Sequence, residues 1–411
     1  MSAPDWKSIR SEFPTLAHWT YLDCARKTIP PRCQERALQD YTRDVYENAG
    51  ADAWSAVNVA ETRAAMAQLL GAKPTEIAFT KNTTEGLNIA AHGFDLRPGD
   101  NVVLTDLEHV ANVWVWKHWE AKGVEIRLAR NREGRLPLEA FLEKMDARTR
   151  VVSTAYVTYG NGYRVNLPEL GRACRSRGVR LVVDGVQGIG ILGARLDALG
   201  ADIIAAGGHK GLLGLTGSGI VYCREELVNQ LRADFVKQPA AEPAGLAHVV
   251  SQFDYVRTAH RFEGGNPNFL GIRVLRAGAD FLRAIGLDRI ESRVRELTTA
   301  CLKLLKAAGL DSQTPDVWEE RAHIVNVLVP DAASLMNRLR EQHRVVTNVK
   351  DGALRLSMSF YNDEEDLDRM VRALRQELGG KSTPARKAPS AAREAPQPGG
   401  QFPPARSGSG T

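Results

Sequence analysis

Short runs of β-branched and other apolar residues alternate with amphipathic stretches between about residues 60 and 225. In order, the runs are EIAFT, NVVLT, EIRLA, RVVSTAYV, RLVVD, ADIIAA and GIVYC. Strand-sized runs separated by helical stretches are typical of a mostly parallel sheet with helices on its faces. Ligands bind such sheets at the carboxyl ends of the strands, so the residues that follow each run are the first candidates for a functional site.

The pattern changes after about residue 265, where long helical stretches precede the short apolar runs HIVNVLV, HRVVTNV and ALRLSMS and a last amphipathic helix near EDLDRMVRALRQEL. This order predicts a smaller α+β domain that closes over the first. We therefore expect an N-terminal arm (1–20), a large α/β domain (21–255) and a small α+β domain (256–378). The remainder (379–411) is rich in Pro, Ala, Arg and Gly, which predicts a disordered tail.

The composition narrows the class of protein. The chain has 411 residues, of which 43% are hydrophobic, and its 54 Lys+Arg and 49 Asp+Glu leave a small net charge of +5, so no nucleic-acid partner is expected. No apolar run approaches the roughly 20 residues of a membrane helix, and the N-terminus does not resemble a signal peptide. We expect a cytoplasmic protein that does not bind membranes. Its five cysteines are scattered without CxxC spacing, so neither a metal site nor a disulfide framework is expected.

Two ionisable residues follow neighbouring strand runs. Asp184 ends RLVVD, and Lys210 lies in the glycine-lined turn GGHKG after ADIIAA. A carboxylate at a buried strand end needs a cationic or hydrogen-bonding partner, and the protonated ring nitrogen of pyridoxal 5′-phosphate (PLP) would supply one. Each residue alone also fits an ordinary role, Lys210 as an exposed loop lysine and Asp184 as a helix cap.

A third motif, FTKNTTEGLN, places Thr83 and Thr84 where a strand turns into a helix. Backbone N–H groups and hydroxyls at the start of a helix can hold a phosphate. The same residues also describe a plain capping box.

The order and spacing of these motifs resemble the class V aminotransferases, a branch of the fold-type I PLP-dependent enzymes that includes cysteine desulfurases, selenocysteine lyases and isopenicillin N epimerase. The resemblance spans about residues 13 to 375 and implies the fold-type I PLP-dependent transferase fold, with its mostly parallel sheet between helices. It implies that Lys210 forms a Schiff base with PLP. It also implies that Asp184 contacts the pyridine nitrogen and that Gln187 contacts the phenolic oxygen of the cofactor.

The resemblance implies further contacts. His109 in DLEHVAN would stack on the cofactor ring, and His209 would join Thr83 and Thr84 at the phosphate. Arg355 in LRLSMSFYN would bind the carboxylate of an amino-acid substrate, and Asn362 completes that motif.

The segment RFEGGNPNFLG, which contains Asn266, resembles the stretch that in this family reaches the cofactor phosphate of a neighbouring subunit. A homodimer with shared active sites is implied.

Several positions depart from the family pattern. Thr158 stands where Asn or Gln is usual near the cofactor ring, Gly207 where a Ser is common and Asn266 where a Thr is common. The segment YLDCARKTIPP introduces Arg26 and Lys27, which we expect to line the substrate entrance and to favour an acidic substrate.

The loop that carries the sulfur-accepting cysteine in cysteine desulfurases has the sequence TNVKDG here. Since it contains no cysteine and a persulfide mechanism needs a mobile thiolate, we expect cysteine desulfurase activity to be disfavoured, with Cys24 as the remaining thiol candidate. A lyase that cleaves a Cβ–S or related bond is expected first, an amino-acid epimerase or racemase second and an aminotransferase third. A degenerate PLP-fold binding protein is the alternative outside the enzymes.

Overall fold

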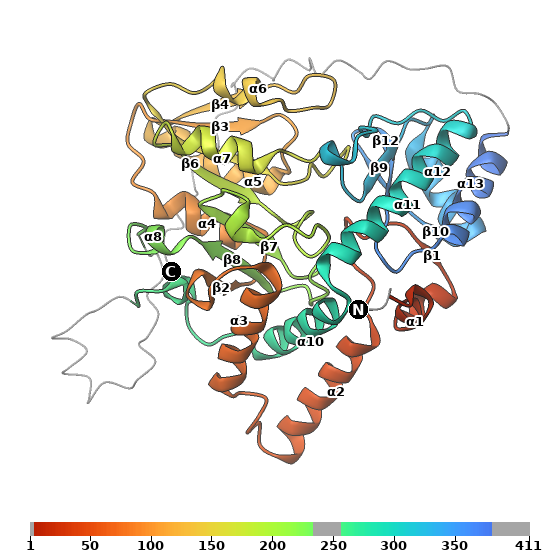
Figure 1. Ribbon diagram of the computed structural model, residues 1–411, viewed down its shortest axis with the longest axis horizontal. Helices are drawn as coiled ribbons and strands as arrows, with labels where there is room; N and C mark the ends of the chain where they lie inside the picture. The colour runs from red at the N-terminus through yellow and green to blue at the C-terminus, as the bar shows by residue number, and fades with distance from the viewer. Residues whose placement is uncertain (1–3, 233–255, 380–411) are drawn as a thin grey trace, which may run out of the picture.

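The structure, a computed structural model, describes residues 4–232 and 256–379. Figure 1 shows a large sheet covered by helices beside a smaller region of helices and strands. The helices are α1 (Trp6–Ser11), α2 (Arg32–Glu47), α3 (Ala56–Leu70), α4 (Thr83–Gly93), α5 (Val110–Lys117), α6 (Leu138–Leu142), α7 (Leu167–Arg175), α8 (Glu225–Val228), α10 (Phe269–Ile285), α11 (Leu287–Ala307), α12 (Ala332–His343) and α13 (Glu364–Leu378). The strands are β1 (Thr20–Tyr21), β2 (Ile77–Thr80), β3 (Asn101–Thr105), β4 (Glu125–Ala129), β5 (Thr149–Ala155), β6 (Arg180–Asp184), β7 (Ile203–Gly207), β8 (Gly219–Cys223), β9 (Ile324–Val327), β10 (Val345–Val346), β11 (Asn348–Lys350) and β12 (Ala353–Ser357).

The large sheet contains all the strands expected between residues 60 and 225. Among the described residues it has seven strands in the order β2-β8-β7-β6-β5-β3-β4. β8 runs antiparallel to both of its neighbours, and the remaining neighbours are parallel. The predicted mostly parallel sheet between helices is therefore confirmed. The carboxyl ends of β2, β3, β5, β6 and β7 meet at one edge of it.

Apolar side chains cover both faces of this sheet. On β6, Leu181 and Val183 pack in one cluster with Leu170 of α7, whereas Val182 packs in another with Leu87 of α4. A strand that is buried on both faces needs a continuous apolar run, which explains the sequence RLVVD. The result is a rigid platform for the polar residues at the ends of its strands.

The smaller region is built on a three-stranded antiparallel sheet in the order β11-β12-β9 among the described residues. Leu297 of α11, Leu339 of α12 and Leu367 of α13 pack with its strands in a separate core. The hairpin between β11 and β12 turns through Asp351 and Gly352, whose φ angles of 51° and 79° are those of a two-residue type I′ turn. The expected sulfur-acceptor loop is thus a tight hairpin.

The chain crosses between the two regions more than once. β1 pairs in parallel with β10, so the N-terminal segment lies against the small region. Conversely, α10, which comes after the large sheet in the sequence, packs on α2 and α3, below that sheet in the view of Figure 1. The domain bounds expected from the sequence stay a prediction, and the expected tail, apart from Gly379, falls outside the described residues. Within those residues, no helix is both long and apolar enough to cross a membrane.

Candidate active site

A cavity of about 550 Å³ opens at the carboxyl edge of the large sheet and is closed on its other side by residues of the small region. It brings together most of the residues expected from the sequence. Those in its wall are Arg26, Thr83, Thr84, His109, Asp184, Gln187, His209, Lys210 and Arg355. Asp184 and Lys210 share this cavity, as a PLP site requires.

The strands of the large sheet place these side chains. β6 ends at Asp184, and the turn after β7 carries His209 and Lys210. α4 begins at Thr83 just after β2, and His109 is the residue before α5. Because each functional residue follows directly on a buried strand, the packing of the sheet fixes their relative positions.

Burial shifts the pKa values of the two central residues in opposite senses. Burial raises the pKa of Asp184, while a hydrogen bond from Val186 N at 3.0 Å and the charge of Lys210 act against this rise. Burial lowers the pKa of Lys210 to about 8, against the opposing charge of Asp184. Lys210 forms no ion pair with any residue that the structure describes. A buried carboxylate facing a partly neutral amine can accept a cationic ring nitrogen between them.

The far end of the cavity has the groups expected to hold a phosphate. Asn82 caps α4 by accepting a hydrogen bond from Glu85 N at 2.9 Å, but the Glu85 carboxylate accepts from Lys81 N, so the full capping box is not formed. Thr83 Oγ1 accepts a hydrogen bond from Gly207 N at 2.9 Å. A Cβ at Gly207 would lie 3.0 Å from His209 Cε1, so a larger residue here would require a small shift of the imidazole. Hydroxyls and backbone N–H groups at the start of a helix form an anion cradle.

His109 and Gln187 lie along the middle of the cavity. Ala111 N donates to His109 Nδ1 at 3.2 Å, which leaves the ring proton on Nε2, and burial lowers the pKa of this histidine. Gln187 Nε2 donates to Ala25 O at 2.9 Å, but its buried Oε1 has no hydrogen-bond partner within the described residues. A hydrogen-bond donor on a bound molecule would satisfy that oxygen. Together with Asp184, which forms no ion pair with a described residue, this indicates that the residues present fit PLP.

Arg355 binds a buried carboxylate that was not predicted from the sequence. Asp23, 1% exposed, accepts a hydrogen bond from Arg355 Nη2 at 3.2 Å. Asn348 Nδ2 donates to both oxygens of Asp23 at 3.2 and 3.1 Å, and Arg355 Nη1 donates to Tyr159 O at 2.9 Å. These contacts hold Arg355 in place. Its buried Nε has no partner in the described part of the chain.

Some residues expected at the site lie outside the cavity wall. The hydroxyl of Thr158 donates to Asn161, and Asn362 binds Tyr21 O and Asp366 in the packing of the N-terminal segment. Lys27 is exposed to solvent and does not line the cavity. Asn266 is also exposed, and its role toward a neighbouring subunit stays a prediction.

Cys24, the thiol candidate nearest to the site, is fully enclosed. It is 4% exposed, its Sγ donates to Met358 O at 3.2 Å, and burial raises its pKa to about 12. A protonated, buried thiol is a poor nucleophile.

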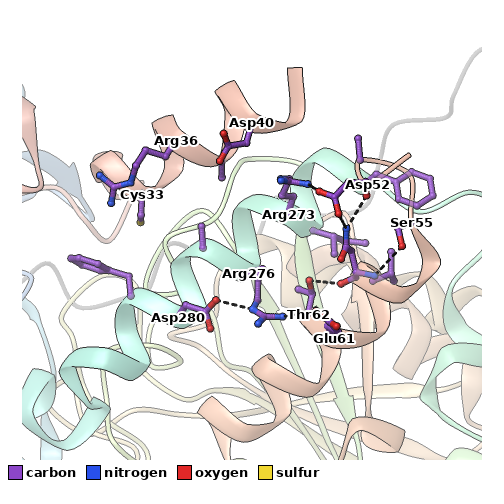
Figure 2. Close-up of a pocket in the computed structure, with 18 residues that line it drawn as sticks. Cys33, Arg36, Asp40, Asp52, Ser55, Glu61, Thr62, Arg273, Arg276 and Asp280 are labelled. Carbon is purple, nitrogen blue, oxygen red and sulfur yellow. Dashed lines mark hydrogen bonds and ion pairs between the residues drawn. The ribbon is translucent and has the colours of Figure 1, made fainter. Parts of the chain in front are cut away.

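A second cavity of about 590 Å³ lies between α2, α3 and α10, away from the strand ends (Figure 2). Most of its charged groups are already paired with one another, while Arg36 and Asp40 pair with Glu12 and Arg43 outside its wall. Arg273 binds Asp52, and Arg276 binds Asp280 at 2.7 Å. These pairs join the elements around the groove and leave the first cavity as the candidate active site.

Comparison with known proteins agrees with this geometry. The sequence pattern of the family described as aminotransferase class-V matches residues 20–370. A probable cysteine desulfurase of Methanothermobacter thermautotrophicus is 28% identical, over 91% of this chain and 98% of its own. A cysteine desulfurase of Cronobacter sakazakii is 30% identical, over 90% of this chain and 97% of its own.

Solved structures show the same fold. The apo structure of a cysteine desulfurase from Thermococcus onnurineus superposes with a TM-score of 0.83 at 24% identity, covering 93% of this chain and 99% of the other. A variant of the protein C-DES, with glycine covalently linked to its PLP cofactor, gives a TM-score of 0.82 at 20% identity, covering 90% and 99%.

These comparisons overturn one expectation. We expected cysteine desulfurase activity to be disfavoured, and this is wrong, because relatives of that name match about nine-tenths of the chain. One missing cysteine in a single loop is weaker evidence than a match that covers about nine-tenths of the chain. The TNVKDG hairpin bears only on which group accepts the sulfur, whereas the activation of the amino acid at Cα depends on the cofactor and on the residues around it.

Proposed function

Because the chain belongs to the class-V aminotransferase family, whose members use PLP, we propose that it breaks the carbon–sulfur bond of cysteine or of a closely related amino acid. The observation that carries this proposal is the cavity that Asp184 and Lys210 share, with the Thr83 cradle at one end and Arg355 at the other. The names of these two relatives support carbon–sulfur chemistry, and neither names an epimerase or an aminotransferase. A degenerate binding protein would not need the lysine, the aspartate and the histidine together.

The bound cofactor supplies an electron sink that weakens the bonds at Cα of an attached amino acid and so permits loss of a group from Cβ. Lys210 would hold the cofactor covalently and, once released, carry a proton at Cα. Its pKa of about 8 keeps a fraction of the amine neutral near pH 7, as a base requires. Asp184 would keep the ring nitrogen protonated, and the His109 ring would lie against the cofactor.

Arg355 would bind the α-carboxylate of the substrate. Its contacts with Asp23 and Tyr159 O use only part of the guanidinium, which has five N–H donors. Since those contacts fix its orientation, little side-chain entropy is lost when the carboxylate binds.

We include a homodimer in this proposal. α5 follows His109 directly and presents Val110 and Trp114 to solvent, 54% and 70% exposed. Large apolar side chains exposed beside a site are typical of an interface. Light scattering that gives twice the chain mass of 45.1 kDa would support it, and a monomer would contradict it.

The test uses the purified protein with PLP. We expect absorbance near 410 to 430 nm that disappears in Lys210→Ala, and sulfide release from L-cysteine that falls by at least about a thousandfold in that variant. With a thiol reductant present, alanine formed together with sulfide indicates desulfuration, and pyruvate with ammonia indicates elimination. Loss of chirality without sulfide would contradict the proposal, as would a protein that never takes up PLP. Lys303→Met, an exposed position on α11, serves as the control.

A further inference from the structure

β11, the strand beside Arg355, carries a second cationic residue, Lys350, in the wall of the same cavity. Asn348 and Lys350 lie two residues apart on β11, so their side chains share one face of the small sheet. Asn348 is paired with Arg355 across the sheet, and all three residues line the cavity. Lys350 is therefore a diagonal neighbour of Arg355, which places the two backbone positions roughly 7–8 Å apart.

The two cations differ in what they already bind. The charge of Arg355 is matched by the buried carboxylate of Asp23. Lys350 has no carboxylate partner within residues 4–232 and 256–379, and its Nζ lies 6.0 Å from the centre of the Tyr159 ring in the same wall. Arg26, also in the wall, has no carboxylate partner in these ranges either. The substrate end therefore has more positive charge than a single α-carboxylate offsets.

Arg26 and Lys350 approach the cavity from different sides. Arg26 belongs to the segment that runs beside the lysine turn, where Thr28 N donates to His209 O at 3.0 Å. Lys350 stands on the small region beside Arg355. An anionic group on the substrate side chain would meet Lys350 while the α-carboxylate stays on Arg355, because a short amino acid spans a comparable distance.

We propose that Lys350 determines substrate specificity by binding a second anionic group at the end of the substrate side chain. Besides cysteine, the preferred substrates are then amino acids whose side chain ends in an acidic group. This inference rests on the proposed function for the orientation of the substrate, with its α-carboxylate on Arg355.

A pair of ligands that differ in one charge tests this inference. Succinate and its monoamide, succinamate, have nearly the same size, and neither has an amine that could react with the cofactor. Titration calorimetry on the PLP-loaded protein should show that succinate binds about tenfold more tightly than succinamate. Lys350→Met should remove that preference by weakening succinate alone, and Lys350→Arg should keep it. Lys303→Met should bind both ligands as the parent protein does.

Two results would overturn the inference. One is equal binding of succinate and succinamate to the parent protein, and the other is an equal loss of both in Lys350→Met. Turnover separates this inference from the proposed function. If no variant releases sulfide while the preference for succinate remains, the proposed function fails and the second anion site stands.

Discussion

The two ends of the cavity are built in different ways. At the cofactor end, Thr83, His109, Asp184 and Lys210 each lie at or shortly after the end of a strand of one sheet, and each position depends on the few residues around it. At the substrate end, Arg355 meets Asp23 across 332 residues of chain. The cofactor end is therefore set by local strand-to-turn geometry. The substrate end exists only when the N-terminal segment and the small region have come together, so changes at the two ends should have different kinetic signatures.

The largest effect is expected at the cofactor end. Asp184→Asn removes the charge that would keep the ring nitrogen protonated, so kcat for sulfide release should fall by about a hundredfold or more with little change in KM. Steady-state kinetics with L-cysteine would measure both constants. Asp197→Asn, an exposed carboxylate outside the cavity, is the matched control. Unchanged kcat in Asp184→Asn would remove the basis for assigning this aspartate to the cofactor.

A change at the substrate end should act mainly on KM. Asp23→Ala leaves Arg355 buried without its carboxylate, so we expect KM for L-cysteine to rise about thirtyfold while kcat stays within a few-fold. Losing one partner of a buried pair costs about 3–5 kcal/mol of stability, so the fold is checked by thermal unfolding.

The milder variant Asp23→Asn keeps a hydrogen-bond acceptor for Arg355 and should recover part of the lost affinity. Asp23 acts as a positioning residue, and a fall in kcat with KM unchanged would contradict that role.

The smallest effect concerns pH. Burial lowers the pKa of Lys210 to about 8, so its amine is mostly protonated at pH 7 and mostly neutral at pH 9. Only the neutral amine can attack an aldehyde. Uptake of PLP by the apoprotein should therefore speed up by about fivefold between pH 7 and 8, and by no more than about twofold from pH 8 to 10. Stopped-flow absorbance would follow it, and a rate that does not change across this range would disprove the shifted lysine.

The sequence was informative where local pattern determines structure. Runs such as RLVVD became buried strands, and the polar residues after them, Asp184 and Lys210 among them, line one cavity. Apolar runs carry no information about strand direction, so the antiparallel course of β8 could not be predicted. The two residues of β1 were too short a signal to show that they pair with β10.

The sequence also could not show which side chains become partners in the folded protein. The segment YLDCARK suggested a charged entrance, and Arg26 lines the cavity while Lys27 does not. Asp23 lies in the same segment, but its contact with Arg355 depends on how distant parts of the chain pack. A carboxylate three residues before Arg26 was the only signal available.

The pairing of β1 with β10 has a consequence for synthesis. Thr20 and Tyr21 meet Val345 and Val346, so β1 has no partner until the ribosome has made the residues of β10. At ordinary rates of translation that wait lasts roughly 15–65 s. During it the nascent chain can assemble the large sheet, including the turns of Asp184 and Lys210, while Asp23 remains in water. Arg355 emerges later still, and the pocket for the substrate can form only after it has met Asp23.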